Sequence, residues 1–375
     1  MPIDKELLFQ LLFAIVAALL VSLASTPVVK TFACKVGAID VPGEERRVHD
    51  HPIPRMGGLA IFLGFLISVL LFADINRQMQ GILLGCVIIV ATGAVDDIVS
   101  LNAWVKLGLQ ILAAVVAVLH GVTIEILVNP FFWTDSPYLI LGGFSIPITI
   151  FWIVAITNSV NLIDGLDGLA VGVSAISSIT MLIIALFVAD SNAAIVLAAL
   201  TGACIGFMPY NMNPAKIFMG DTGALLLGYV LSTVSVVGLF KFYAVISFAV
   251  PVLALAVPLF DTMFAFFRRL IHGQSPFHAD RGHFHHRLLD MGLNQKQAVA
   301  VLYTISAILG LSAVVLATSG EMKALILILG FCVCAVIWAF AYKSHRASLE
   351  HAKLKHQQEN AGSDNLNSED SNEKN

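Results

Sequence analysis

Charged side chains are scarce in this chain. Asp, Glu, Lys and Arg make up only 12% of its 375 residues, whereas 58% are hydrophobic and the mean hydropathy is +0.87. A soluble domain of this length needs more charge to cover its surface, so the composition excludes a soluble protein. It indicates a protein whose partner is the lipid bilayer, and we expect no nucleic-acid partner.

Other signals are missing as well. The five cysteines form neither a disulfide framework nor a zinc pair. The first apolar run has no small-residue cleavage site, which predicts a retained anchor and not a signal peptide. No inverted pair of hydropathy segments is evident, and such pairs are typical of secondary transporters. A transporter that couples to Na⁺ or H⁺ through acidic side chains is therefore the less favoured alternative.

Long apolar runs take up most of the chain. Runs of roughly 17–25 residues, separated by short polar connections, predict transmembrane helices. Pro251 and Pro258 predict a kink in the ninth run. We therefore expect one all-α polytopic membrane domain over residues 1–345 and a polar, disordered tail over residues 346–375. The eleven predicted spans lie at about 7–29, 57–73, 80–95, 104–121, 146–163, 167–189, 193–211, 223–240, 244–267, 298–318 and 324–342.

Lysine and arginine are distributed unevenly among the connections. The first connection contains Lys30, Lys35, Arg46, Arg47 and Arg55, and later connections of the same parity hold most of the others. By the positive-inside rule these connections are cytoplasmic. The pattern predicts that the N-terminus lies outside the membrane and the C-terminus lies in the cytoplasm.

Five aspartates stand where predicted spans end, all on the predicted cytoplasmic side: Asp96, Asp97, Asp164, Asp167 and Asp221. A carboxylate near hydrocarbon is costly, so each is a functional candidate. Several acids on one face provide hard oxygen ligands suited to Mg²⁺, which usually accompanies phosphates. We expect Mg²⁺ as the cofactor, with Mn²⁺ as an alternative.

The adjacent pair Asp96-Asp97 ends the third predicted span, and Lys106 follows it at the start of the fourth. Two adjacent carboxylates repel each other unless a cation holds them, which favours a functional role for the pair. A solvated helix end is the competing interpretation.

The segment NSVNLIDGLDGL places polar side chains at every third position from Asn158 to Asp167. On an ideal α-helix, Asn161, Asp164 and Asp167 cover a stripe of about 120°. We expect this stripe to face a ligand, although a short turn made of Asn, Asp and Gly is the alternative.

The segment PYNMNPAKIFMGDTGALLLG contains Asn211, Asn213 and Asp221 in a short connection. Asp221 is predicted to be the N-cap of the eighth span, where the helix dipole favours an anion. A cap and a metal ligand do not exclude each other.

The segment FHADRGHFHHRLLD is dense in basic side chains. His283 and His286 are three residues apart, so in a helix they share a face. Together with Arg281 and His285 they favour an anion cradle for a pyrophosphate, with a zinc site or a solvated basic loop as alternatives. Asp261, inside the ninth span, is expected to pair with an arginine or to position a substrate.

Taken together, these stretches resemble the polyprenyl-phosphate N-acetylhexosamine-1-phosphate transferase family from about residue 28 to residue 300. The form ADRGHFHHRLLDMG is similar to the UDP-N-acetylglucosamine branch. It departs from the muramoyl-pentapeptide branch, in which three consecutive histidines are usual. The matching pieces are PRMGG at Pro54–Gly58, the pair Asp96-Asp97, NLIDGLDGL, the Asn211-to-Asp221 loop and the His283–His286 cluster.

This resemblance implies transfer of GlcNAc-1-phosphate from UDP-GlcNAc to undecaprenyl phosphate, which releases UMP and starts a cell-surface glycan of the teichoic-acid or surface-antigen type. Transfer of phospho-MurNAc-pentapeptide is the alternative, and a homodimer is expected by analogy. The implied roles are Mg²⁺ binding by Asp221; a nucleotide-diphosphate site at Asn161 and Asp164; uridine contacts by Asp167 and Phe218; support by Asn211; lipid-phosphate contacts by Asp96, Asp97 and Lys106; and diphosphate or sugar contacts by His285 and His286.

We expect a single in-line displacement, with Asp96 or Asp97 orienting the lipid phosphate. The alternative is a two-step route through a phosphorylated aspartate. The expected catalytic set is Asp96, Asp97, Asp164, His285 and His286.

Overall fold

The computed structural model describes residues 5–41, 51–128, 138–188, 190–239, 249–271 and 283–319, together with residues 323 and 328. The described residues up to 319 belong to one unit, Met1–Glu321. The predicted tail, Arg281 and, apart from residue 328, the predicted span at 324–342 lie outside the described residues.

Helices dominate the part of the chain that the structure describes, and the strands there form two short hairpins. The helices are α1 (Lys5–Val36), α2 (Gly58–Phe72), α3 (Arg77–Val99), α4 (Ala103–Leu119), η1 (Gly142–Phe144), α5 (Ser145–Leu162), α6 (Leu169–Phe187), α7 (Ser191–Asn211), α8 (Gly220–Val234), the π-helix η2 (Ser235–Leu239), α9 (Ala249–Ala254), α10 (Ala256–Ile271), α11 (Phe284–Asp290) and α12 (Gln295–Ser319). The strands are β1 (Ile39–Asp40), β2 (Ile53–Pro54), β3 (Ile126–Val128) and β4 (Tyr138–Ile140).

The first ten predicted spans all coincide with helices. Seven helices of the described chain are long and apolar enough to cross a membrane, and α2 and α4 are shorter apolar helices. The prediction of an all-α polytopic membrane protein is therefore confirmed. The predicted kink is confirmed too, because the ninth span is divided at Leu255 into α9 and α10.

Polar side chains define where several helices begin. The side-chain oxygen of Asn76 accepts a hydrogen bond from the Met79 amide at 2.9 Å at the start of α3. Asn102 and Asp190 cap α4 and α7 in the same way. Each cap satisfies a backbone donor that the first helical turn leaves without a partner.

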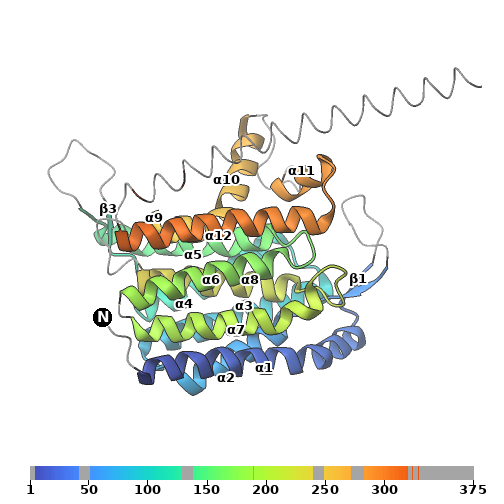
Figure 1. The fold of residues 1–375 in the computed structure, drawn as a ribbon, viewed down its shortest axis with the longest axis horizontal. Coiled ribbons are helices and arrows are strands. Elements are labelled where there is room, and N and C mark those ends of the chain that lie inside the picture. Colours follow the sequence, from blue (N-terminus) through green and yellow to red (C-terminus); the bar gives the residue numbers. More distant parts are fainter. Residues whose placement is uncertain are drawn as a thin grey trace, which may run out of the picture. The chain divides into compact units, whose positions relative to one another are not determined.

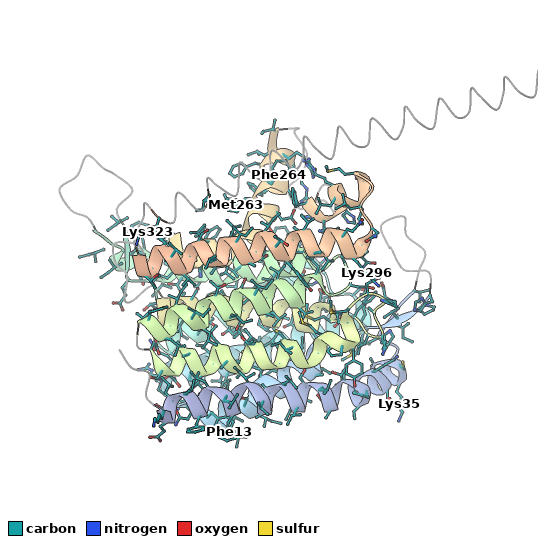
Figure 2. All side chains as sticks on the ribbon, viewed as in Figure 1. Phe13, Lys35, Met263, Phe264, Lys296 and Lys323 are labelled. Carbon is teal, nitrogen blue, oxygen red and sulfur yellow. The ribbon has the colours of Figure 1, made fainter. Side chains whose placement is uncertain are left out.

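Helix α8 lies at the centre of the bundle and is the most buried of the seven candidate spans. It packs against α3 and α5, while α1 packs against α7 and α2 at the edge (Figure 1). Figure 2 shows Phe13 on the outer face of α1, where 56% of its surface is exposed. An exposed apolar face suits a helix that faces lipid hydrocarbon.

Glycines bring three helix ends into backbone contact. A Cβ added to Gly58 of α2 would overlap the backbone nitrogen of Gly223 in α8. A Cβ added to Gly93 of α3 would overlap the backbone of Thr222. The first turn of α8 is therefore wedged between α2 and α3, and this contact fixes the end of the bundle where β1 and α11 also lie (Figure 1).

This packing predicts that Gly58→Ala destabilises the protein, because the added methyl meets backbone that cannot move aside. We expect a loss of about 1–3 kcal/mol in the free energy of unfolding. The matched control is Gly108→Ala in α4, where a Cβ meets nothing within 4 Å. It should stabilise by about 0.5–1 kcal/mol through helix propensity. Thermal unfolding in detergent measures both, and equal melting temperatures for the two variants would contradict the close contact.

Candidate active site

A cavity of about 380 Å³ opens at the end of the bundle where α3, α5 and α8 meet. It brings together segments that are far apart in the sequence. Its lining includes Asp40, His51, Arg55, Asp97, Asn161, Asp164, Asp167, Asn211, Asn213, Phe218 and Asp221. Four of the five predicted aspartates thus line one cavity. The fifth, Asp96, is connected to it by Lys106, which bonds both Asp96 and the cavity residue Asp221.

Asp97 caps the N-terminus of α8 from a different helix. Its carboxylate accepts hydrogen bonds from the backbone amides of Asp221 at 3.0 Å and Thr222 at 3.1 Å, and from the Thr222 hydroxyl at 2.6 Å. The prediction that Asp221 is the N-cap is wrong, because α8 begins at Gly220 after Met219 and Asp221 lies in the first turn. The anion that complements the helix dipole is mainly Asp97.

Lys106 connects Asp96 to Asp221. Its ammonium donates to the Asp96 carboxylate at 2.8 Å and forms an ion pair with Asp221. The other oxygen of Asp221 accepts from the Asn161 amide at 2.9 Å. Asp96 also accepts from the Leu101 amide at 2.7 Å, which fixes the turn between α3 and α4. The repulsion expected between adjacent acids is thus relieved separately, by a cation at Asp96 and by backbone amides at Asp97.

The polar stripe is not one helical face. Helix α5 ends at Leu162, so Asn161 lies on the helix while Asp164 and Asp167 lie in the turn before α6. Gly168 makes that turn with φ of +79°, a conformation that glycine adopts without strain. The turn alternative was therefore correct for the second half of the segment, and the turn still directs both acids to the cavity.

Asp164 carries the signature of crowded negative charge. Its half-buried position, reinforced by the charges of Asp221 and Asp97, raises the pKa of its carboxyl to about 8, while Arg55 acts in the opposite direction. Carboxylates that repel one another in this way are stabilised when a cation binds between them.

Asp167 holds the loop that leads to α8. One of its oxygens accepts from the Asn213 side chain and from the Ala215 amide, both at 3.0 Å. The buried Asn211 donates to the Ile217 carbonyl at 3.1 Å, and its own carbonyl oxygen has no partner among the described residues. An acceptor buried in a cavity wall without a partner is suited to a ligand donor.

The PRMGG segment pairs with the FMGD segment through its backbone. The Phe218 amide donates to the Pro54 carbonyl at 2.8 Å, and the amides of Gly57 and Gly58 donate to Phe218 and Met219, each at 2.9 Å. Between them Met56 has φ of +69°, which is uncommon for a residue other than glycine. Backbone strain of this kind is held by surrounding contacts and clusters at functional sites.

The histidine cluster lies beside the cavity and not in its wall. His283 is the N-cap of α11 and bonds Asp261 through Nδ1 at 2.9 Å. Among the described residues Asp261 thus pairs with a histidine and not with an arginine, and the alternative that it positions a substrate stays a prediction. The prediction that His283 and His286 share a helical face assumed that both lie in a helix, but α11 begins at Phe284, after His283. The ring of His285 contacts the rings of both.

His285 is buried beside Gly165, one residue from Asp164. Burial and the neighbouring His286 lower the pKa of His285 to about 4, so its ring is uncharged at neutral pH. The predicted binding of a diphosphate by His285 and His286 stays a prediction, and in this arrangement His285 offers it no charge.

The sequence is also similar to those of known proteins. The profile of glycosyl transferase family 4 matches residues 79–239. A probable undecaprenyl-phosphate N-acetylglucosaminyl 1-phosphate transferase of Bacillus subtilis (strain 168) is 41% identical over 316 residues, 83% of this chain and 86% of that protein. The chain belongs to glycosyl transferase family 4. The resemblance that the motifs indicated is therefore confirmed.

Two further relatives represent the N-acetylglucosamine and muramoyl-pentapeptide branches of family 4. Decaprenyl-phosphate N-acetylglucosaminephosphotransferase of Mycobacterium tuberculosis (strain CDC 1551 / Oshkosh) is 34% identical over 78% of each chain. A phospho-N-acetylmuramoyl-pentapeptide-transferase of Thermoanaerobacter sp. (strain X514) is 35% identical, but over only 61% of this chain and 76% of that protein. The similarity to the N-acetylglucosamine relatives thus extends over more of the chain.

Two acidic side chains of the cavity could hold Mg²⁺ together with substrate phosphates. Within the described ranges, no three His, Cys, Asp or Glu side chains form a preassembled metal cluster. Mg²⁺ is usually held by one or two carboxylates, with substrate phosphates and water completing its shell. Asp221 and Asp164 would supply such carboxylates in this family 4 protein, and the raised pKa of Asp164 supports that placement.

The first connection contributes three polar cavity residues that were missing from the predicted site: Asp40, His51 and Arg55. Gln295, at the start of α12, was missing as well. For the first connection, the PRMGG motif was the available signal, but its sequence alone does not reveal that the segment pairs with the FMGD loop.

The raised pKa of Asp164 predicts a pH-dependent stability. Between about pH 4 and pH 8 the folded protein retains a proton that the unfolded chain has lost, so this carboxyl destabilises the fold increasingly as the pH rises. In EDTA, the melting temperature of Asp164→Asn should therefore exceed that of the wild type by an amount that grows from pH 5 to pH 8. Mg²⁺ at pH 8 should narrow the difference. The exposed Asp74→Asn serves as the control, and a difference that stays constant with pH would contradict the assignment.

Proposed function

We propose that this chain transfers GlcNAc-1-phosphate from UDP-GlcNAc to undecaprenyl phosphate and releases UMP. One observation carries the proposal: polar residues of three separate motifs, represented by Asp97, Asp164 and Asp221, meet at one cavity at the end of a membrane-type bundle. The names of the N-acetylglucosamine relatives, which match most of the chain, support this donor and a polyprenyl phosphate acceptor.

The position of the cavity suits two substrates of opposite character. A soluble nucleotide sugar reaches the end of the bundle from water, whereas the polyprenyl chain stays in lipid. Transporter sites lie near the middle of the bilayer, so acids gathered at one end favour the enzyme over the transporter alternative.

The reaction is an in-line displacement. An oxygen of the lipid phosphate forms a bond to the sugar-bearing phosphorus of UDP-GlcNAc, and the bond from that phosphorus to the UMP oxygen breaks. A phosphate monoester has its second pKa near 6, so the nucleophile is largely deprotonated at neutral pH and needs no strong base. Bound Mg²⁺, or Mn²⁺, supplies neutralisation of the charge that develops on the phosphates.

The position of each side chain in or beside the cavity indicates its role in this reaction. Asp221 and Asp164 would hold the metal, and Phe218 and Asp167 lie in the wall where uridine would bind. Asp97 already accepts three hydrogen bonds from α8, which supports a positioning role. Asp96 and Lys106 form the ion pair at the cavity edge and are the better candidates to orient the lipid phosphate.

The wider setting belongs to the same proposal. Eleven spans in the bacterial inner membrane, an outside N-terminus and a cytoplasmic site would let the enzyme use cytoplasmic UDP-GlcNAc. A teichoic-acid or surface-antigen glycan would follow, and a homodimer is the expected assembly. Transfer of phospho-MurNAc-pentapeptide is the second candidate, supported by the shorter match to the muramoyl-pentapeptide relatives.

The donor assignment predicts which nucleotide sugars release UMP when they are mixed with the protein. Purified protein in detergent, with Mg²⁺ and undecaprenyl phosphate, should release UMP from UDP-GlcNAc and not from UDP-MurNAc-pentapeptide, UDP-GalNAc or an EDTA-treated tube. Release from the pentapeptide donor would move the protein to peptidoglycan synthesis. If the folded protein releases UMP from none of these donors, the proposed function is wrong.

The metal assignment predicts that Asp221→Asn lowers UMP release by at least about 10²-fold, the scale on which removal of a charge-stabilising group acts in other enzymes. The protein should still fold, because Asn retains an acceptor for Asn161. Asp74→Asn is the matched control, since it removes the same charge from an exposed connection outside the cavity lining. Near-normal turnover by Asp221→Asn would rule out the metal role.

A further inference from the structure

The β1–β2 hairpin carries an arginine to the acidic cavity. Arg55 follows directly after β2 and lines the cavity with Asp164 and Asp221. We infer that Arg55 is a substrate-binding residue that contacts a phosphate group in this cavity, and that Asp40 positions its guanidinium for that contact. This inference rests on the proposed function and assigns a role within it.

The backbone fixes where Arg55 stands. Its amide donates to the Ala38 carbonyl at 2.9 Å, which ties it to the chain just before β1. On either side, Pro54 and Gly57 bond the backbone of Phe218, three residues from Asp221. Arg55 is therefore held in register with the segment that carries Asp221.

The side chain is fixed as well. Arg55 Nη2 donates to Asp40 Oδ1 at 2.7 Å. The Asp40 side chain is 9% exposed, whereas that of Arg55 is 34% exposed, so the carboxylate is the buried anchor and the guanidinium is the accessible partner. A guanidinium has five N–H donors in a planar fork. One contact with Asp40 therefore leaves other N–H groups that can donate hydrogen bonds to a phosphate.

The charge of the cavity favours a cation at this position. The described lining contains five carboxylates, those of Asp40, Asp97, Asp164, Asp167 and Asp221, and Arg55 is the one Lys or Arg within it. Lys106 is engaged by Asp96 and Asp221 and does not line the cavity. A phosphate that enters meets net repulsion unless a fixed cation offsets part of it, and arginine binds phosphate in a bidentate manner.

The phosphate has two sources in this reaction: the diphosphate of the nucleotide sugar and the headgroup of the polyprenyl phosphate. Both present the same chemistry to a guanidinium. The kinetic constants for the two substrates distinguish them, because loss of the contact raises the KM of the substrate that makes it.

The test compares Arg55→Gln with a control at the same end of the molecule. Lys35→Gln also removes one positive charge, from an exposed residue at the end of α1 (Figure 2). The measurements are the KM for UDP-GlcNAc, the KM for undecaprenyl phosphate, and the dissociation constants of UDP and uridine with Mg²⁺ present. We expect Arg55→Gln to raise one KM about tenfold or more, the effect of a lost charge-assisted hydrogen bond, while Lys35→Gln stays at wild-type values.

Binding of UDP and uridine identifies the group that is recognised. If Arg55 contacts the donor, Arg55→Gln raises the dissociation constant of UDP. The dissociation constant of uridine stays unchanged, because uridine has no phosphate. If it contacts the acceptor, only the KM for undecaprenyl phosphate rises. Arg55→Lys should recover part of the loss, since a lysine keeps the charge but not the fork.

The double variant Asp40→Asn/Arg55→Gln separates binding from a structural ion pair. It removes both charges, so no carboxylate is left buried without its partner. If Arg55 only neutralised Asp40, the double variant would regain wild-type constants, and this result would overturn the inference. A double variant as impaired as Arg55→Gln supports it. Failure of the proposed function is a different result, in which the wild type itself releases no UMP.

Discussion

The site depends on one interaction between two helices, the carboxylate of Asp97 at the N-terminus of α8. Backbone amides at a helix start carry partial positive charge and have no partner within the helix. Charge-assisted hydrogen bonds of this type contribute about 1.5–3 kcal/mol each, and Asp97 makes three while only 7% exposed. The contact needs the close approach that Gly58 and Gly93 allow. With α8 fixed in this way, Asp221 has one position relative to α3, α4 and α5.

Around that fixed point the molecule gathers negative charge and offsets it locally. Lys106 neutralises Asp96 and Asp221, Arg55 neutralises Asp40, and His283 bonds Asp261. Asp164 is left with crowded charge, as its raised pKa indicates. A site of this kind holds a cation and an anion together better than it holds either one alone. The proposed transfer would use such a site, because Mg²⁺ and a diphosphate would bind in it side by side.

Much of the fold could be predicted from the sequence, because bilayer thickness sets the length of apolar runs and proline breaks a helix at a predictable place. The gathering of the aspartates at one end followed from the alternation of spans. The details that failed depend on contacts between distant residues. The α8 cap was assigned to Asp221 because its true partner, Asp97, lies 125 residues from Thr222. Arg55 was not singled out because its position arises from pairing with Phe218. His283 was not among the expected partners of Asp261, an arginine or a substrate, because α11 could not be placed beside that residue.

The long separation between Asp97 and the start of α8 also bears on biosynthesis. A chain emerging from the ribosome inserts α1 to α7 before the residues that complete the cavity have been made. During that interval Asp97 lacks the amides that it later accepts from, and Gly58 and Gly93 lack the α8 backbone against which they pack. The cavity therefore forms late, after α8 has entered between helices that precede it in the sequence, and a nascent chain that stops before residue 220 lacks the helix start on which the candidate site depends.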